Sequence, residues 1–153
     1  MSRDSAGGGC KPDVVVLYCQ HCVEASVRQG DSFRRLDDFS VRQIVVPCSS
    51  KVDERLLLKM LENGTDGILV IGCPERACKF LVGSLRAERR VQHVRRILDE
   101  IGVGSERVSM LRRGGLTSEG LLDLARQRAD EVRRLGENPA KGGGERSVHA
   151  QPA

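Results

Sequence analysis

Residues 67–73 read Gly-Ile-Leu-Val-Ile-Gly-Cys, and their uninterrupted aliphatic centre predicts a strand over 67–71. The run has no polar alternation, which is typical of a strand covered on both faces in a parallel sheet. Runs of similar character at 14–18, 43–46 and, more weakly, 107–111 predict three further strands. The sequence therefore favours a parallel sheet of about four strands.

Helical patterns separate the later runs. Apolar residues recur at spacings of three and four over 53–63, 87–101 and 118–135, and a shorter helix is expected after Cys22. Each of the three longer patterns stops just before a glycine, a frequent signal for a helix end. Strands that alternate with helices imply right-handed crossovers. The predicted fold class is α/β, a small doubly wound parallel sheet.

The length of 153 residues suits one domain with tails. Residues 1–12 and 137–153 are rich in Gly and charged residues, which predicts disordered tails around a domain at 13–136. Aromatic residues make up only 3% and the net charge of +4 is spread along the chain, so we expect no nucleic-acid partner. With no long apolar run and no secretory signal, we expect no membrane association and a cytoplasmic location.

Five of the six cysteines stand just past the ends of predicted strands. They are Cys19 and Cys22 after the first strand, Cys48 after the second, and Cys73 and Cys78 after the third. Because the carboxyl ends of parallel strands meet at one edge of the sheet, we expect these thiols to converge. The sixth, Cys10, precedes the domain and is expected to be a free thiol.

Clustered thiols in a reducing compartment indicate a metal or redox site, and four thiolates admit zinc or an iron–sulfur cluster. A structural zinc is less needed in a domain that has its own aliphatic core. A thioredoxin-type enzyme would use Cys19 and Cys22 but leave the other thiols idle. Pro74 fits the first position of a helix, whose N-terminal N–H groups favour an anionic cluster near Cys78. No Gly-rich phosphate motif follows the first strand, so nucleotide binding is not expected.

Other residues allow two interpretations. His21, between two thiols, is either an exposed loop residue or a donor or ligand at the site, and Gly72 either permits close backbone approach or simply turns the chain. Five arginines on one predicted helix either dock an acidic partner or form a solvated face. They are Arg86, Arg89, Arg90, Arg95 and Arg96.

With those residues in view, the chain resembles the delta (iron–sulfur) subunit family of methyl-viologen-reducing, coenzyme F420-non-reducing hydrogenase. The resemblance lies in Leu-Tyr-Cys-Gln-His-Cys at 17–22, Val-Pro-Cys-Ser-Ser-Lys-Val-Asp at 46–53, the run at 64–78, and Ala-Glu-Arg-Arg-Val at 87–91. It implies a flavodoxin-like domain with one 2Fe-2S cluster. It also implies partners: a hydrogenase or other dehydrogenase, and the flavin/iron–sulfur subunit of a heterodisulfide reductase-like complex.

The resemblance further implies which thiols hold the cluster. All five strand-end cysteines match family positions, one more than four ligands require. We expect Cys22, Cys48, Cys73 and Cys78 to be the ligands, with Cys19 exchanged for one of them or lying beside them. Such a protein would relay electrons and convert no substrate by itself. The alternative is a zinc-stabilised interaction module without redox activity.

Overall fold

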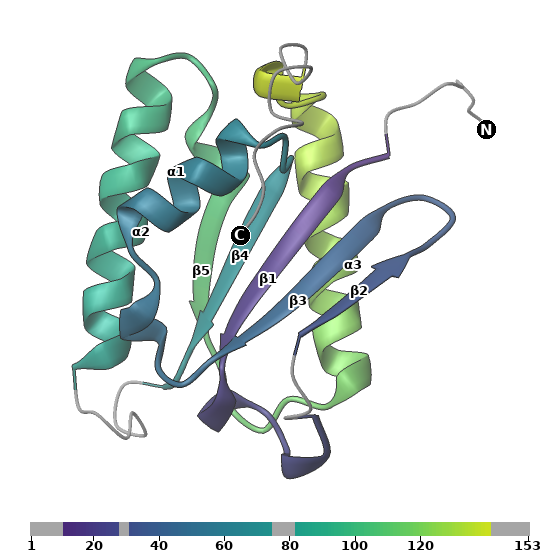
Figure 1. Ribbon diagram of the computed structural model, residues 1–153, viewed down its shortest axis with the longest axis vertical. Helices are drawn as coiled ribbons and strands as arrows, with labels where there is room; N and C mark the ends of the chain where they lie inside the picture. Colours follow the sequence, from purple (N-terminus) through teal and green to yellow (C-terminus); the bar gives the residue numbers. More distant parts are fainter. Residues whose placement is uncertain (1–10, 28–30, 75–81, 142–153) are drawn as a thin grey trace.

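The computed structural model describes residues 11–27, 31–74 and 82–141 (Figure 1). Its centre is a five-stranded sheet in the order β2-β3-β1-β4-β5. The strands are β1 (Asp13–Cys19), β2 (Ser32–Arg35), β3 (Ser40–Val46), β4 (Gly67–Gly72) and β5 (Val108–Arg112). All neighbouring strands are parallel except β2 and β3, which are antiparallel. The α/β class and the four expected strands are confirmed.

Helices cover both faces of this sheet, which explains the continuous apolar runs. Figure 1 shows α1 (Glu54–Glu62) and α2 (Gly83–Glu100) on one face and α3 (Ser118–Leu135) on the other. Alternate residues of β1 serve the two cores: Val16 packs on the α3 side, and Leu17 on the side of α1 and α2. No helix in the described ranges is long and apolar enough to cross a bilayer.

The helix boundaries follow the local capping chemistry. The Asp53 carboxylate accepts a hydrogen bond from Leu56 N at 2.8 Å, and the Thr117 hydroxyl accepts one from Gly120 N at 3.0 Å. Gly64, just after α1, has a φ of +104°, a conformation that favours glycine. The expected helices therefore occur, although α2 begins at Gly83, four residues before the apolar pattern indicates.

Two segments differ from expectation. Strand β2 was not predicted, because Ser-Phe-Arg-Arg is a short polar run with every residue exposed, as an edge strand permits. The segment after β1 forms two 3₁₀ turns, η2 (Gln20–Cys22) and η3 (Ala25–Val27), in place of the expected short helix. Apart from residues 28–30, which are not described, the connection from β1 to β3 is thus made of turns and a hairpin strand.

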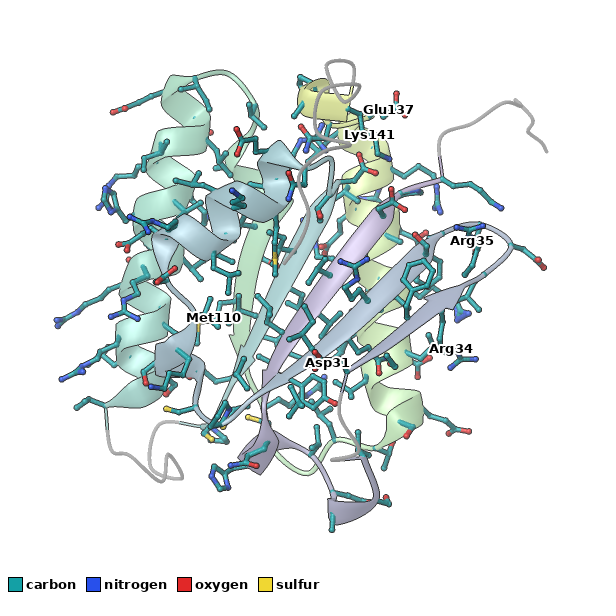
Figure 2. The ribbon with its side chains drawn as sticks, in the orientation of Figure 1. Asp31, Arg34, Arg35, Met110, Glu137 and Lys141 are labelled. Atoms are coloured by element: carbon teal, nitrogen blue, oxygen red, sulfur yellow. The ribbon has the colours of Figure 1, made fainter. Side chains whose placement is uncertain are left out.

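The folded chain continues past residue 136, the boundary that composition indicates. Asn138 is 2% exposed, and its side-chain amide donates to the carbonyls of Leu61 at 2.8 Å and Thr65 at 2.6 Å. Lys141 Nζ lies 2.5 Å from Asp66 Oδ2. These contacts place residues 137–141 at the amino end of the sheet, where Figure 2 labels Glu137 and Lys141. The tail predictions for 1–10 and 142–153 lie outside the described residues.

Candidate metal centre

Three thiols meet at the carboxyl edge of the sheet. Cys73 Sγ lies 3.7 Å from Cys19 Sγ and 3.7 Å from Cys22 Sγ, and all three sulfur atoms lie within 4.8 Å of one another. Each residue is at most 3% exposed. Their convergence follows from topology, because Cys19 ends β1 and Cys73 follows its parallel neighbour β4. Figure 2 shows the yellow sulfur atoms gathered at this end of the sheet.

The 3₁₀ turn η2 brings Cys22 back over the strand ends. His21 N–H donates to Cys19 Sγ at 3.4 Å, so Cys19 caps the start of the turn. At its other end, the Cys22 carbonyl accepts a hydrogen bond from Leu116 N at 2.9 Å, and the Cys22 thiol lies 3.9 Å from the Ile71 carbonyl. The turn is therefore anchored to β4 and to the loop after β5.

Hydrogen bonding divides the negative charge unequally among the three thiols. The hydrogen bond from the Cys22 thiol lowers the pKa of Cys19 to about 5. That same bond, together with burial and the nearby thiols, raises the pKa of Cys22. One thiolate is thus stabilised, whereas ionising all three in this buried place requires a compensating cation. The site is suited to a bound metal more than to three independent thiolates.

Cys48 lies at the same edge but faces a different neighbour. It caps η4 (Ser49–Lys51), and its sulfur accepts hydrogen bonds from Ser50 N at 3.4 Å and Ser50 Oγ at 3.2 Å. The loop adjoins the thiols, since Cys19 Sγ lies 3.8 Å from the Pro47 carbonyl. Among the described residues, however, only Cys19, Cys22 and Cys73 form the group within 4.8 Å. Ligation by Cys48 remains a prediction.

Arg90 positions the Cys48 loop, a role that the sequence does not reveal. Its guanidinium donates to the carbonyl of Ser50 at 2.5 Å and to that of Val52 at 3.2 Å. Arg90 is one of five arginines on α2, and no local pattern distinguishes it from the others. Its partners lie about forty residues away in the sequence, so the contact depends on the packing of α2 against η4.

Gly72 has the close-packing role that one interpretation of the sequence gave it. A Cβ atom there would lie 2.8 Å from Met110 Cε, 3.0 Å from Ser84 Cβ and 3.3 Å from Ser49 Oγ. β5, α2 and η4 all approach the backbone at this point. The residue before Cys73 must therefore be small for the edge to close.

The remaining predicted site residues lie elsewhere or outside the described ranges. His21, which the sequence left as either an exposed loop residue or a group at the site, is half-buried within the thiol turn. Residues 75–81 are not described, so the positions of Cys78 and of the helix expected after Pro74 stay predictions. Cys10 also lies outside the described residues.

The donor chemistry of the described edge suits a soft metal. Cys19, Cys22, Cys48 and Cys73 are buried and none is in a disulfide. Thiolate sulfur selects zinc or iron–sulfur clusters. Backbone N–H groups of His21 and Ser50 already point at two of these sulfurs, as they do around many iron–sulfur clusters. The residues therefore fit an iron–sulfur group and, equally, zinc.

Comparison with known proteins identifies the family. Residues 14–136 match the family described as methyl-viologen-reducing hydrogenase, delta subunit. The chain is 31% identical over 131 residues to the vhu iron-sulfur subunit of the F420-non-reducing hydrogenase of Methanococcus maripaludis, covering 86% of this chain and 98% of that protein. It is 32% identical over 111 residues to the iron-sulfur subunit of the F420-non-reducing hydrogenase of Archaeoglobus profundus, covering 72% and 80%.

A different kind of protein is also similar. One subunit of the ferredoxin:CoB-CoM heterodisulfide reductase of Methanosarcina mazei is 30% identical over 100 residues, which cover 65% of this chain but only 13% of that protein. A stretch like this chain is therefore also found within a much longer polypeptide. From the match over 14–136 and the hydrogenase iron-sulfur relatives, the chain belongs to the family of the delta subunit of methyl-viologen-reducing hydrogenase.

Proposed function

We propose that this chain is an electron-transfer subunit that holds one 2Fe-2S cluster at the carboxyl edge of its sheet. The observation that carries the proposal is the group of three buried thiols, Cys19, Cys22 and Cys73, in a protein whose relatives are named iron-sulfur subunits. When bound, such a cluster accepts and releases one electron at a time. The chain itself supplies ligation, hydrogen bonds and burial.

Five thiols are available for four ligand positions. We propose that Cys22, Cys48, Cys73 and Cys78 hold the cluster, as the sequence suggests. By distance, Cys19 is as well positioned for ligation as Cys22, since both sulfurs lie 3.7 Å from Cys73 Sγ. The central position of Cys73 makes it the thiol whose loss should matter most.

The proposed partners are a hydrogenase or other dehydrogenase and a heterodisulfide reductase-like flavin/iron–sulfur subunit. The names of two relatives support this assignment: one is an iron-sulfur subunit of a hydrogenase, and the other is a long heterodisulfide reductase polypeptide that contains a similar stretch. Two proteins that are separate in one organism and fused in another commonly work together. Electron relay between these partners, in the cytoplasm, is the role we propose.

The test is metal analysis and spectroscopy of the full chain purified without oxygen. We expect about two iron and two sulfide ions per chain, and a paramagnetic signal that appears on one-electron reduction. Cys73→Ser should lose the iron and the signal, because a poorly ionised hydroxyl replaces a soft thiolate. Cys10→Ser is the matched control and should keep both. One of Cys19→Ser and Cys22→Ser should be much milder than Cys73→Ser.

Two results would contradict the proposal. Stoichiometric zinc without iron, in a chain that no reductant changes, would establish the zinc-stabilised interaction module instead. Full iron and an unchanged spectrum in Cys73→Ser would show that the cluster lies elsewhere.

A further inference from the structure

The five arginines of α2 separate into two groups with different surroundings. Arg90 and Arg95 point inward: Arg90 binds the Ser50 carbonyl, and Arg95 donates to the Val108 carbonyl at 2.6 Å. The other three, Arg86, Arg89 and Arg96, are exposed, and within the described part of the chain none forms an ion pair. Two arginines are thus structural and three are available to another molecule.

Arg86 and Arg89 stand at the edge of the sheet that holds the thiols. They lie in the first two turns of α2, whose next arginine, Arg90, is bonded to the loop of Cys48. Two more exposed cations lie at this edge: Lys51 ends η4, and Arg113 follows β5 with its N–H bonded to the Gly72 carbonyl at 2.9 Å. Neither forms an ion pair with a described residue. Four cations that form no ion pair with a described residue therefore lie around the thiol edge.

Within the described ranges, acidic groups do not neutralise this part of the edge. Glu88 points to Arg112, with which it forms an ion pair. Glu24 is exposed at the same edge but on the far side of the site, where its N–H is bonded to Leu116. Asp53, two residues after Lys51, is also exposed and caps α1. Counted over the described residues, the side formed by α2, η4 and the end of β5 keeps a net positive charge.

An exposed apolar spot lies at the start of α2, next to Arg86 and Arg89 in the sequence. Val82 is 45% and Leu85 is 41% exposed, and both belong to the start of α2. The other large apolar side chains with comparable exposure in the described structure, Phe33 and Ile101, belong to β2 and to the far end of α2. Apolar side chains next to charged ones are common in protein–protein interfaces, whose buried core is apolar and whose rim is polar.

We propose that this surface, Lys51, Val82, Leu85, Arg86, Arg89 and Arg113, docks an acidic surface of the heterodisulfide reductase-like flavin/iron–sulfur subunit named above as an electron partner. The inference rests on the proposed function, because it assumes that electrons enter or leave at the thiol edge. Opposite charges speed the encounter by roughly 10- to 1,000-fold at low salt, and the effect falls as salt screens the charges. The apolar spot then packs against the partner once water is excluded.

The test compares two charge reversals of equal size in the full, cluster-loaded chain. Arg89→Glu lies on the proposed surface. Arg134→Glu is the matched control, since Arg134 is also exposed and unpaired with described residues but lies near the end of α3, at the amino end of the sheet. The probe is the purified heterodisulfide reductase-like flavoprotein of the same organism. Association is followed by stopped-flow or surface plasmon resonance over a series of salt concentrations.

We expect Arg89→Glu to slow association by about tenfold or more at low salt and to flatten its salt dependence, whereas Arg134→Glu changes the rate by less than about twofold. Leu85→Ser should instead speed dissociation, because the apolar contact acts after the encounter. Equal rates for the wild type, Arg89→Glu and Arg134→Glu would overturn the docking surface while leaving the proposed function intact. A wild-type chain that neither binds this flavoprotein nor exchanges electrons with it would overturn both.

Discussion

Replacing Gly72 by alanine adds one methyl group at the end of β4, directly before Cys73. The added Cβ would overlap three neighbours, at 2.8 Å from Met110 Cε, 3.0 Å from Ser84 Cβ and 3.3 Å from Ser49 Oγ. Met110 can turn its flexible end away. Ser84 Cβ cannot, because it is fixed to the backbone of α2.

The expected cost follows from these distances. Overpacking of this kind destabilises a fold by about 1–3 kcal/mol, and the fixed position of Ser84 favours the upper half of that range. Alanine also lowers the conformational entropy of the unfolded chain, which offsets this loss of stability by about 0.4–1 kcal/mol. The net loss in the free energy of unfolding should be about 1–2.5 kcal/mol, equivalent to a fall in melting temperature of roughly 2–10 °C for a chain of this size.

The assay is thermal unfolding of the metal-free chain, followed by iron content after reconstitution. Gly114→Ala is the matched control at the same edge: its Cβ would lie 3.7 Å from Pro74 Cδ, an ordinary contact, so its melting temperature should not fall. Gly72→Ala should also bind less iron, because relief of the overlap displaces Cys73. An unchanged melting temperature in Gly72→Ala would refute the claim that three elements close on this glycine.

Three further predictions concern hydrogen bonds. Ser50→Ala removes the hydroxyl that donates to Cys48 Sγ at 3.2 Å. If Cys48 is a ligand, the midpoint potential of the cluster in a redox titration should become more negative while the iron content stays unchanged. An unchanged potential would argue against ligation by Cys48. Asn138→Ala leaves two carbonyls without their amide donor and should lower the free energy of unfolding by about 2–4 kcal/mol in urea titrations, whereas a disordered 137–141 segment would make it neutral. Burial alone would lower the pKa of Lys141, but hydrogen bonds and charges from Asp66 and Asp13 raise it above 10.5 overall. The stabilisation of the fold by this pairing is therefore complete at neutral pH and is lost as pH rises through the raised pKa of Lys141. The stability gap between wild type and Lys141→Met should therefore stay constant from about pH 7 to 9 and narrow only above 10.5; narrowing below about pH 9 would contradict the pairing.

The central fold was predictable because burial on both faces leaves a clear pattern. The runs at 14–18 and 67–71 are apolar throughout since helices cover both sides of β1 and β4. Strand β2 has no such pattern, because it lies at an edge where polar residues are tolerated. Buried Asn138 was equally hidden, since a polar side chain that bonds backbone carbonyls does not differ in sequence from a solvated one.

The site was predictable in outline only. The meeting of Cys19, Cys22 and Cys73 was predictable, because these thiols follow parallel strands whose carboxyl ends lie at one edge of the sheet. The direction in which each side chain points does not follow. Cys48 turns toward Ser50, and Arg90 reaches the same loop from a helix about forty residues later, so both contacts depend on packing that spacing alone does not encode.

The two ends of the described domain lie next to each other, since Lys141 Nζ is 3.1 Å from Asp13 Oδ2. A unit whose entry and exit points adjoin can be inserted into a host polypeptide without stretching the host between them. Gene fusion could therefore convert a separate protein into an internal segment with little change to its fold. A similar stretch makes up 13% of one heterodisulfide reductase polypeptide, so a unit of this kind is also carried as part of a longer chain.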